Sequence, residues 1–245
     1  MKKRKFKLPV GLIVVTFLIL VILCFVLGYI WKSAKNAEYF RVTEIIMKDP
    51  VKVDFSHLKG KNIFSIDLGK ESEHVLKSFP EYSNIRIVRV LPNRIFVDFL
   101  KRSPVALLKL YKYFVLDGQG VLFYDSALIE NSELPVILGL ETKIFGPKSG
   151  RRYNTKEIRL VLEILKEANN NGFAQDHKIE NINLIDLNNI LISVENIEVR
   201  LPQDDIGVKL AILGNLFAQS RDKINGIKYI DLRFKDAVIK YKDDK

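Results

Sequence analysis

The stretch LPVGLIVVTFLILVILCFVLGYIW occupies residues 8–31 and carries no charged side chain. A helix needs about 20 apolar residues to cross a hydrocarbon core of about 30 Å, and a lone segment in lipid satisfies its backbone hydrogen bonds only as a helix. We therefore expect one transmembrane helix over residues 10–31. Its anchoring residues, from end to end, are Val10, Leu20, Tyr29 and Trp31.

The flanks of this run predict its orientation. The tail, residues 1–9, contains five basic residues and no acid: Lys2, Lys3, Arg4, Lys5 and Lys7. Basic clusters stay in the cytoplasm, and aromatic rings such as those of Tyr29 and Trp31 favour the far membrane–water interface. We expect a single-pass protein with a cytoplasmic N-terminus and with everything after Lys32 in the periplasm or outside the cell.

A cleaved signal peptide is the alternative interpretation of the same run. Its apolar region is usually about 7–15 residues long and ends at a small-x-small site. The run is longer here, and Lys32 and Lys35 interrupt the positions before Ala34 and Ala37. The sequence favours a retained anchor.

The charge of the chain argues against a nucleic-acid partner. The net charge is +10, but the tail supplies five of the 39 basic residues and none of the 29 acids. This leaves 34 basic and 29 acidic residues, scattered along the rest of the chain. Such a distribution is typical of a solvated surface with mild attraction to anionic lipid or wall polymer.

The first exported region, residues 38–108, has the pattern of a small α+β layer. The third of its strands alternates cleanly, with Ile95, Val97 and Phe99 on one face. A three-stranded sheet covered by two helices accounts for the pattern. The expected strands are residues 39–47, 84–90 and 94–101, and the expected helices are about 54–58 and 68–79.

The second exported region, residues 109–241, is predicted to be a larger mixed β-sheet domain with two helices. Asp117-Gly118-Gln119-Gly120 separates two short apolar runs, as in a hairpin turn where glycine admits positive φ. One helix begins at a cap on Asn154 or Thr155 and ends near Asn170. The remaining expected elements are strands at 113–116, 121–124, 179–186, 190–194, 197–201, 227–234 and 237–241, a buried segment at 134–139 and a helix at 204–219. Residues 242–245 are expected to be a frayed tail.

No catalytic pattern is present in the sequence. The histidines His57, His74 and His177 are far apart and lack a zinc-site spacing, and the only cysteine, Cys24, lies inside the membrane run. Gly118-x-Gly120 lacks the helix and the Gly-Lys-Ser/Thr of a phosphate loop. We expect no catalytic residue, no metal and no cofactor, although acids that converge only in three dimensions leave a hydrolase open.

Four features together resemble the FtsQ/DivIB family of bacterial cell-division proteins. The first is the order of basic tail, single helix and exported region. The second is the run from Pro80 to Ala106, with Leu91-Pro92-Asn93 and Arg102-Ser103-Pro104-Val105-Ala106. The third is the hairpin at 115–123, and the fourth is Tyr229-Ile230-Asp231-Leu232-Arg233-Phe234. Lys101, where the family often has glutamate, and Pro202, where it commonly has glycine, depart from the pattern.

The resemblance implies an α+β fold, with a POTRA-type domain over 38–108 and a β-domain over 109–241. It implies a non-catalytic scaffold of the division machinery at the septum of the cytoplasmic (inner) membrane, which helps to control septal peptidoglycan synthesis. The implied partners are small bitopic coiled-coil proteins, FtsB- or DivIC-like and FtsL-like, and other septal synthesis proteins, besides the lipid bilayer.

The last expected strand is the candidate binding site. A strand that comes last in a sheet and lies at its edge exposes backbone groups that a partner strand completes. Asp231 and Arg233 alternate along the preceding run, where an ion pair with neighbours is the alternative to binding. For Phe234 the alternative is a place in the core. The candidate partner-binding residues are Arg233, Phe234, Ala237, Val238, Ile239, Lys240 and Tyr241.

Two other functions compete with a division scaffold. One is a membrane-anchored assembly module of an export or secretion complex, where POTRA-like units also occur. This chain lacks the run of about ten amphipathic strands that forms a membrane barrel. The other is a membrane-tethered wall hydrolase.

Overall fold

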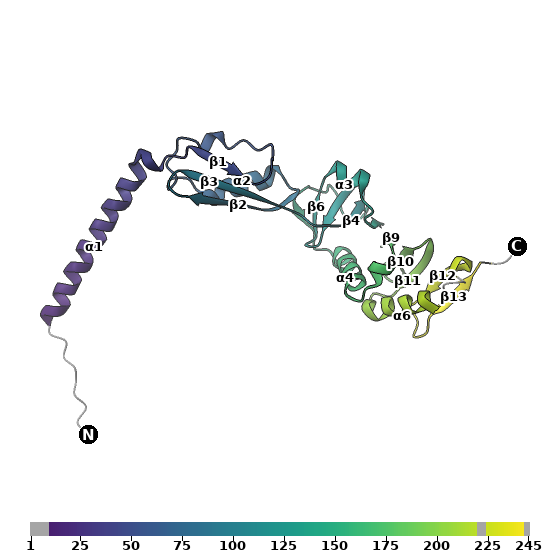
Figure 1. The fold of residues 1–245 in the computed structure, drawn as a ribbon. Helices are drawn as coiled ribbons and strands as arrows, with labels where there is room; N and C mark the ends of the chain where they lie inside the picture. Colours follow the sequence, from purple (N-terminus) through teal and green to yellow (C-terminus); the bar gives the residue numbers. More distant parts are fainter. Residues whose placement is uncertain (1–9, 220–223, 243–245) are drawn as a thin grey trace, which may run out of the picture. The chain divides into compact units, whose positions relative to one another are not determined.

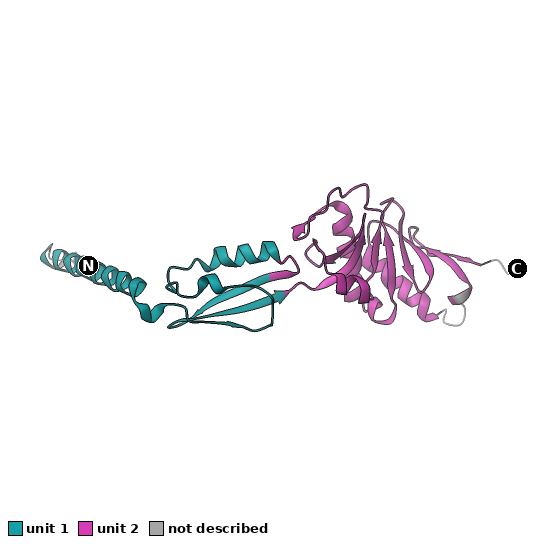
Figure 2. Cartoon of the chain, turned by 90° about the horizontal axis from the view of Figure 1, so that it is seen from above, with its two compact units in different colours: residues 1–78, 84–100 teal, residues 79–83, 101–245 magenta. Residues whose placement is uncertain are grey.

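The computed structural model describes residues 10–219 and 224–242, which form two compact units (Figures 1 and 2). Unit 1 comprises residues 1–78 and 84–100, and unit 2 comprises residues 79–83 and 101–245. The basic tail at 1–9 and the final residues 243–245 lie outside the described residues. The assignment of residues 38–108 and 109–241 as POTRA-type domain and β-domain stays a prediction.

The apolar stretch forms α1 (Val10–Asn36), a helix of 27 residues. Large side chains such as Phe25, Tyr29 and Trp31 are exposed along it. Exposed apolar area costs about 25 cal/mol per Å² in water, so this helix requires an apolar environment. Within the described residues it is the helix whose length and composition suit a membrane span, which supports the predicted single-pass anchor.

Unit 1 is built on a sheet of three strands in the order β1-β3-β2. These are β1 (Glu44–Met47), β2 (Tyr82–Val90) and β3 (Arg94–Lys101), with β1 parallel to β3. The helix α2 (Leu68–Ser78) and the short turn η2 (Ser56–Leu58) complete the layer. The predicted face of the third strand is confirmed, since Ile95, Val97 and Phe99 are all buried.

One expected strand of unit 1 is wrong in its first half. Residues 39–47 were expected to be continuous, but the chain forms a short turn, η1 (Glu38–Phe40), before β1 begins at Glu44. The reason is a competing set of backbone bonds. Val42 donates to the carbonyl of Lys61, and Ile63 donates to that of Phe40, so this part of the chain pairs with a loop and not with the sheet.

In unit 2, ten strands between residues 101 and 242 form one mixed sheet in the order β13-β12-β11-β10-β9-β7-β4-β5-β6-β8. The pairs β4–β7, β7–β9 and β11–β12 are parallel, and the other neighbours are antiparallel. The strands are β4 (Pro104–Lys109), β5 (Tyr113–Asp117), β6 (Val121–Phe123), β7 (Val136–Leu138), β8 (Arg151–Arg152), β9 (Ile179–Asn183), β10 (Ile190–Val194), β11 (Ile197–Leu201), β12 (Ile227–Asp231) and β13 (Val238–Tyr241).

Two helices cover one face of this sheet, α4 (Lys156–Asn170) and α6 (Ile206–Gln219) (Figure 1). Their apolar stripes share one core with alternate strand residues such as Ile192, Val199 and Ile230. On the other face, α3 (Ser126–Asn131) packs against β4, β5 and β6. The short α5 (Phe173–Asp176) and η3 (Ile224–Gly226) complete the unit.

The two predicted long helices and the α+β class are confirmed, with Thr155 as the N-cap of α4. The strands β4 and β8 and the helices α3 and α5 were missed. Two strands are shorter than expected, since β9 ends at Asn183 and β12 at Asp231. In each, the side chain of that last residue accepts a hydrogen bond from the backbone two residues on, which turns the chain out of the ladder.

Candidate functional site

The C-terminal hairpin of unit 2 ends in an open strand edge. β12 and β13 run antiparallel, with Asp231 opposite Val238 and Ile230 opposite Ile239. Among residues 10–219 and 224–242, β13 is the last strand of the sheet order and β12 is its one strand neighbour. The expected edge position of the final strand is therefore confirmed, while the binding role of its residues stays a prediction.

The hydrogen-bond register decides which backbone groups face outward. The N–H of Lys242 donates to the carbonyl of Gly226 over 2.8 Å, so it points toward the β12 side. Groups two residues apart along a strand point the same way, which turns Lys240 and Val238 toward β12 as well. The N–H and C=O of Ile239 and Tyr241 consequently face away from β12, along the open edge.

Arg233 is held by the carboxylate of Asp231. Its Nη2 lies 2.6 Å from Asp231 Oδ2 and its Nε 3.0 Å from Oδ1, and the backbone N–H of Arg233 also donates to Oδ1. The side-chain hydrogen bond from Arg233 is the main reason that the pKa of Asp231 lies below its usual range, despite burial. The same contact raises the pKa of Arg233.

Phe234 lies in the bend between the two strands and not in the core. It is 58% exposed, and its ring lies 5.9 Å from the guanidinium carbon of Arg233. The ammonium of Lys209, on α6, donates to the backbone carbonyl of Phe234 over 2.6 Å. This bond fixes the bend against the helix, so the ring is presented to solvent from a restrained backbone.

The seven predicted partner-binding residues divide into two groups by exposure. Ala237 and Ile239 are half-buried and pack against the core of unit 2, and Arg233 is half-buried in its ion pair. The exposed members are Phe234, Val238, Lys240 and Tyr241. Of the four anchor residues, Leu20, Tyr29 and Trp31 are exposed on α1, and Val10 is its first residue.

A contact between an arginine and a tyrosine on the two strands next to β13 was not predicted from the sequence. The guanidinium carbon of Arg200, on β11, lies 4.4 Å from the ring centroid of Tyr229, on β12. Arg200 also pairs with Glu198 over 3.1 Å. The alternation of residues 197–201 predicts that Glu198 and Arg200 share a face, but only the parallel β11–β12 pairing brings Tyr229 beside them.

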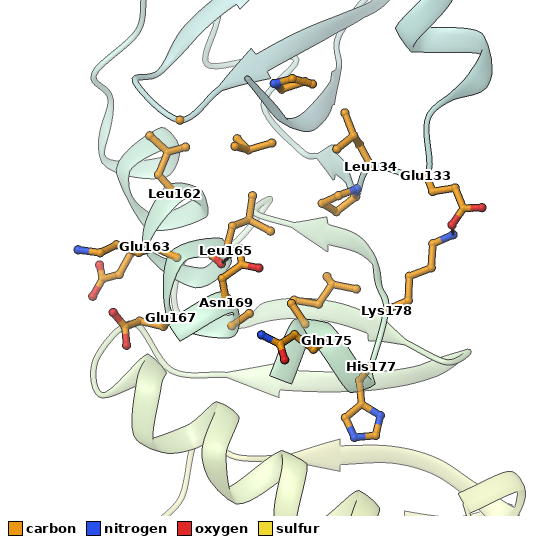
Figure 3. Close-up of a pocket in the computed structure, with 18 of the residues that line it drawn as sticks. Glu133, Leu134, Leu162, Glu163, Leu165, Glu167, Asn169, Gln175, His177 and Lys178 are labelled. Carbon is orange, nitrogen blue, oxygen red and sulfur yellow. Dashed lines mark hydrogen bonds and ion pairs between the residues drawn. The ribbon is translucent and has the colours of Figure 1, made fainter. Parts of the chain in front are cut away.

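A groove of about 1050 Å³ lies beside α4 in unit 2 (Figure 3). Its walls combine apolar residues, among them Leu134, Leu162 and Leu165, with charged groups. The ammonium of Lys178 lies 3.0 Å from the carboxylate of Glu133 and closes one side. The groove thus offers an amphipathic surface, and it was not foreseen from the sequence.

The structure brings His57 and His74 to one pocket of unit 1, whereas His177 lies in unit 2. His57 and His74 line a small pocket of unit 1, where His57 Nε2 lies 2.9 Å from Glu71 Oε2. In unit 2, Nδ1 of His177 lies 2.8 Å from Glu195 Oε1. Within residues 10–219 and 224–242, no group of three or more His, Cys, Asp or Glu side chains is arranged to hold a metal ion.

The fold and the site define the class of protein: an α+β protein with an N-terminal apolar helix suited to a membrane, followed by a mixed-sheet unit with an open final strand. The sequence profile described as "Cell division protein FtsQ/DivIB, C-terminal" matches residues 106–233, just over half of the chain. The chain belongs to the FtsQ/DivIB family of cell-division proteins. The matched region ends at Arg233, before β13.

Curated relatives extend the similarity over most of the chain. The cell division protein FtsQ of Syntrophotalea carbinolica is 23% identical over 212 residues, which cover 83% of this chain and 74% of that protein. FtsQ of Geotalea daltonii is 25% identical, covering 86% and 80%. The cell division protein DivIB of Clostridium acetobutylicum is 27% identical, covering 89% and 85%.

Proposed function

We propose that this protein is a non-catalytic, bitopic scaffold of the division machinery that binds a partner by strand addition at β13. The observation that carries the proposal is the open edge at Ile239 and Tyr241, whose backbone groups face away from β12. An added strand gains main-chain hydrogen bonds from such an edge, and neighbouring side chains supply specificity.

The side chains around the edge support a protein partner. Phe234 and Tyr241 provide exposed aromatic surface, and Val238 adds an exposed apolar side chain. Aromatic residues and arginine are enriched at the energetic centres of interfaces. Arg233 already pairs with Asp231, so its guanidinium is oriented before a partner arrives.

We propose FtsB- or DivIC-like and FtsL-like bitopic proteins as partners, and other septal synthesis proteins as further ones. The α1 helix would confine this chain to the membrane that also holds the bitopic partners, which raises their effective concentration around the binding edge. We also propose that the basic tail at 1–9 is cytoplasmic, that the chain after Lys32 lies on the opposite side of the membrane, and that the protein acts at the septum to help control peptidoglycan synthesis.

The test compares two substitutions of one residue in the detergent-solubilised full chain. Tyr241→Pro removes an outward N–H, and a proline is tolerated at a sheet edge where that group faces solvent. Tyr241→Ala removes the same ring but keeps the N–H. A backbone hydrogen bond contributes a net 0.5–1.5 kcal/mol, so we expect Tyr241→Pro to bind the partner's exported segment about three- to tenfold more weakly than Tyr241→Ala.

The readout is the dissociation constant, measured by titration with the exported segment of the FtsB- or DivIC-like partner. A melting curve for each variant verifies that the fold is kept. Equal affinities for the proline and alanine variants would exclude strand addition at this edge, even if the scaffold role itself were correct.

A further inference from the structure

Four aromatic rings of unit 1 gather at the end of α1. The ring centroid of Phe64 lies 5.4 Å from that of Trp31 and 5.1 Å from that of Phe40, and Tyr39 lies 5.3 Å from Phe40. Trp31 and Tyr39 remain largely exposed, although they belong to this cluster. We call these four residues the aromatic collar. Two separate segments build it, the end of α1 with its following turn and the loop before α2.

The loop of the collar is tied to the last turn of α1. The side-chain amide of Asn62 donates to the carbonyl of Ala34 over 2.9 Å, while its oxygen accepts from the N–H of Phe64. From the other side, Nε of Arg89 donates to the carbonyl of Ile63 over 2.8 Å. Because the helix and the sheet both hold this loop, Phe64 is fixed beside Trp31.

These contacts limit how far the loop can lie from the hydrocarbon core of a membrane. The uncharged run ends at Trp31, and the headgroup layer beyond the hydrocarbon is roughly 5–7 Å thick on each side. The ring of Phe64 is 5.4 Å from that of Trp31, so it lies no further than this along the membrane normal. A Trp31 at the hydrocarbon boundary therefore brings Phe64 into the headgroup layer.

The charges around the collar match an anionic lipid surface. Segments 32–41 and 59–66 contain one acid, Glu38, and that acid pairs with Arg41 over 3.5 Å. The ammonium of Lys35 lies 5.4 Å from the Trp31 ring. The same two segments contain four exposed lysines: Lys32, Lys35, Lys59 and Lys61. Aromatic rings mixed with lysine and arginine are the composition of a membrane interface.

We propose that the aromatic collar, with Lys59 and Lys61, docks the part of unit 1 that follows α1 on the surface of a bilayer that carries anionic phospholipids. The part of unit 1 that follows α1 would then have a fixed tilt on the membrane. The inference rests on the membrane-spanning role proposed for α1, and it adds a second, peripheral contact with lipid to that role.

The test places a polarity-sensitive fluorophore on single cysteines in the full chain, reconstituted in vesicles. Cys24→Ser removes the native thiol, and Lys61→Cys places the label beside the collar. Lys77→Cys is the matched control, because it lies near the end of α2, roughly 14 Å along that helix from its first residue. The vesicles contain phosphatidylcholine with or without phosphatidylglycerol, and a spin label near the headgroup serves as quencher.

We expect a blue-shifted emission at position 61 and quenching several-fold stronger than at position 77, with the largest difference in phosphatidylglycerol. Phe64→Ser should reduce both effects at position 61. Phe145→Ser, which changes an exposed ring in unit 2, should leave them unchanged. Water-like emission at position 61, with quenching equal to that at position 77, would overturn the proposal.

Trp31 separates this proposal from the anchor on which it rests. It is the only tryptophan of the chain, so the intrinsic fluorescence reports the depth of α1 itself. Quenching of Trp31 without quenching at position 61 would leave the anchor intact and contradict docking alone. The absence of both would contradict the anchor.

Discussion

The two edges of the unit 2 sheet are built in opposite ways. At one edge, β8 consists of Arg151 and Arg152, and both side chains are exposed. The N–H groups of the flanking residues Gly150 and Tyr153 donate to the carbonyls of Leu122 and Gly120, in and next to β6. At the other edge, β13 is twice as long and mixes Val238, Ile239 and Tyr241 with one lysine. Short, charged edges discourage pairing with another chain, whereas longer apolar edges favour it.

Two arginine–aspartate pairs of unit 2 differ in burial and in how far apart their partners lie in the sequence. Arg102 and Asp117 are 2.7 Å apart, with side chains only 11% and 5% exposed, and Arg102 also donates to the carbonyl of Pro80. Arg233 is 30% exposed and contacts an aspartate two residues before it. The first pair joins distant segments and serves the fold. The second is local, and its arginine remains accessible.

The largest expected effect lies at the buried Arg102–Asp117 pair. Arg102→Ala would leave the buried carboxylate of Asp117 with its backbone donors, Gln119 and Val121, and without its cationic partner. Removing one partner of a buried ion pair destabilises a protein by about 3–5 kcal/mol. We expect a loss of this size in denaturant unfolding of the detergent-solubilised chain.

The control for that experiment is an exposed ion pair of the same unit. Lys178→Ala breaks the contact with Glu133, whose side chain is 86% exposed, and should change stability by at most about 1 kcal/mol. Losses of similar size for Arg102→Ala and Lys178→Ala would contradict the contrast between the buried and the exposed pairs.

A smaller effect is expected at the open edge, and it depends on pH. The pKa of Asp231 is lowered from its ordinary value of 3.8, chiefly by the hydrogen bond from Arg233. A depressed folded pKa stabilises the fold above the unfolded value, and this contribution is lost as the pH falls through the folded pKa. Asp231→Asn should therefore lower the free energy of unfolding at pH 7 and flatten its decline below about pH 4.

The measurement is denaturant unfolding between neutral pH and about pH 2, a range that spans the unfolded carboxyl value. Glu163→Gln is a suitable control, because that carboxylate is exposed on α4. Below about pH 4, the free energy of unfolding of Asp231→Asn could fall with pH as steeply as that of the unchanged chain. That result would show that Arg233 does not lower the pKa of Asp231 in the folded protein.

The smallest expected effect is at β8. Replacing Arg151 and Arg152 by valine should change the unfolding free energy by less than about 0.5 kcal/mol, since both side chains are exposed. The charged barrier to pairing would be gone, so weak self-association should become detectable by sedimentation velocity. Arg159→Val, on the surface of α4, removes a charge without touching an edge and should stay monodisperse to the same degree as the unchanged chain.

The sequence predicted elements wherever a local pattern was sufficient. The alternation of Ile95, Val97 and Phe99, the cap at Thr155 and the turn at Asp117-Gly118-Gln119-Gly120 all depend on near neighbours, and the structure has each of them. The final strand also follows the predicted range within one residue.

Errors arose where distant groups compete for the backbone. Residues 39–43 have a strand pattern, but the backbone groups of Phe40 and Val42 bond to Ile63 and Lys61 in a loop instead of to the sheet. β8 has two residues, too few for any alternation, and exists only through pairing with β6. The helix α3 did carry a signal, since the side chain of Asp125 caps it by accepting from the N–H of Leu128.

The candidate site also combines features that a local pattern predicts with features that depend on distant contacts. The strand at 237–241 was predicted from its own residues, whereas the orientation of each of its backbone groups required the register set by Lys242 and Gly226. The exposure of Phe234 depends on Lys209 of α6, and the Arg200–Tyr229 contact on a parallel pairing. The aromatic collar joins Trp31 to Phe64 across 33 positions, and no local pattern links them.

The most direct test of the central claim is amide hydrogen exchange of the full chain, with and without the exported segment of the FtsB- or DivIC-like partner. Partner binding by strand addition predicts new protection at the amides of Ile239 and Tyr241, with no change at Arg151 and Arg152 of β8. Unchanged exchange rates at the amides of Ile239 and Tyr241 while the partner is bound would contradict the account.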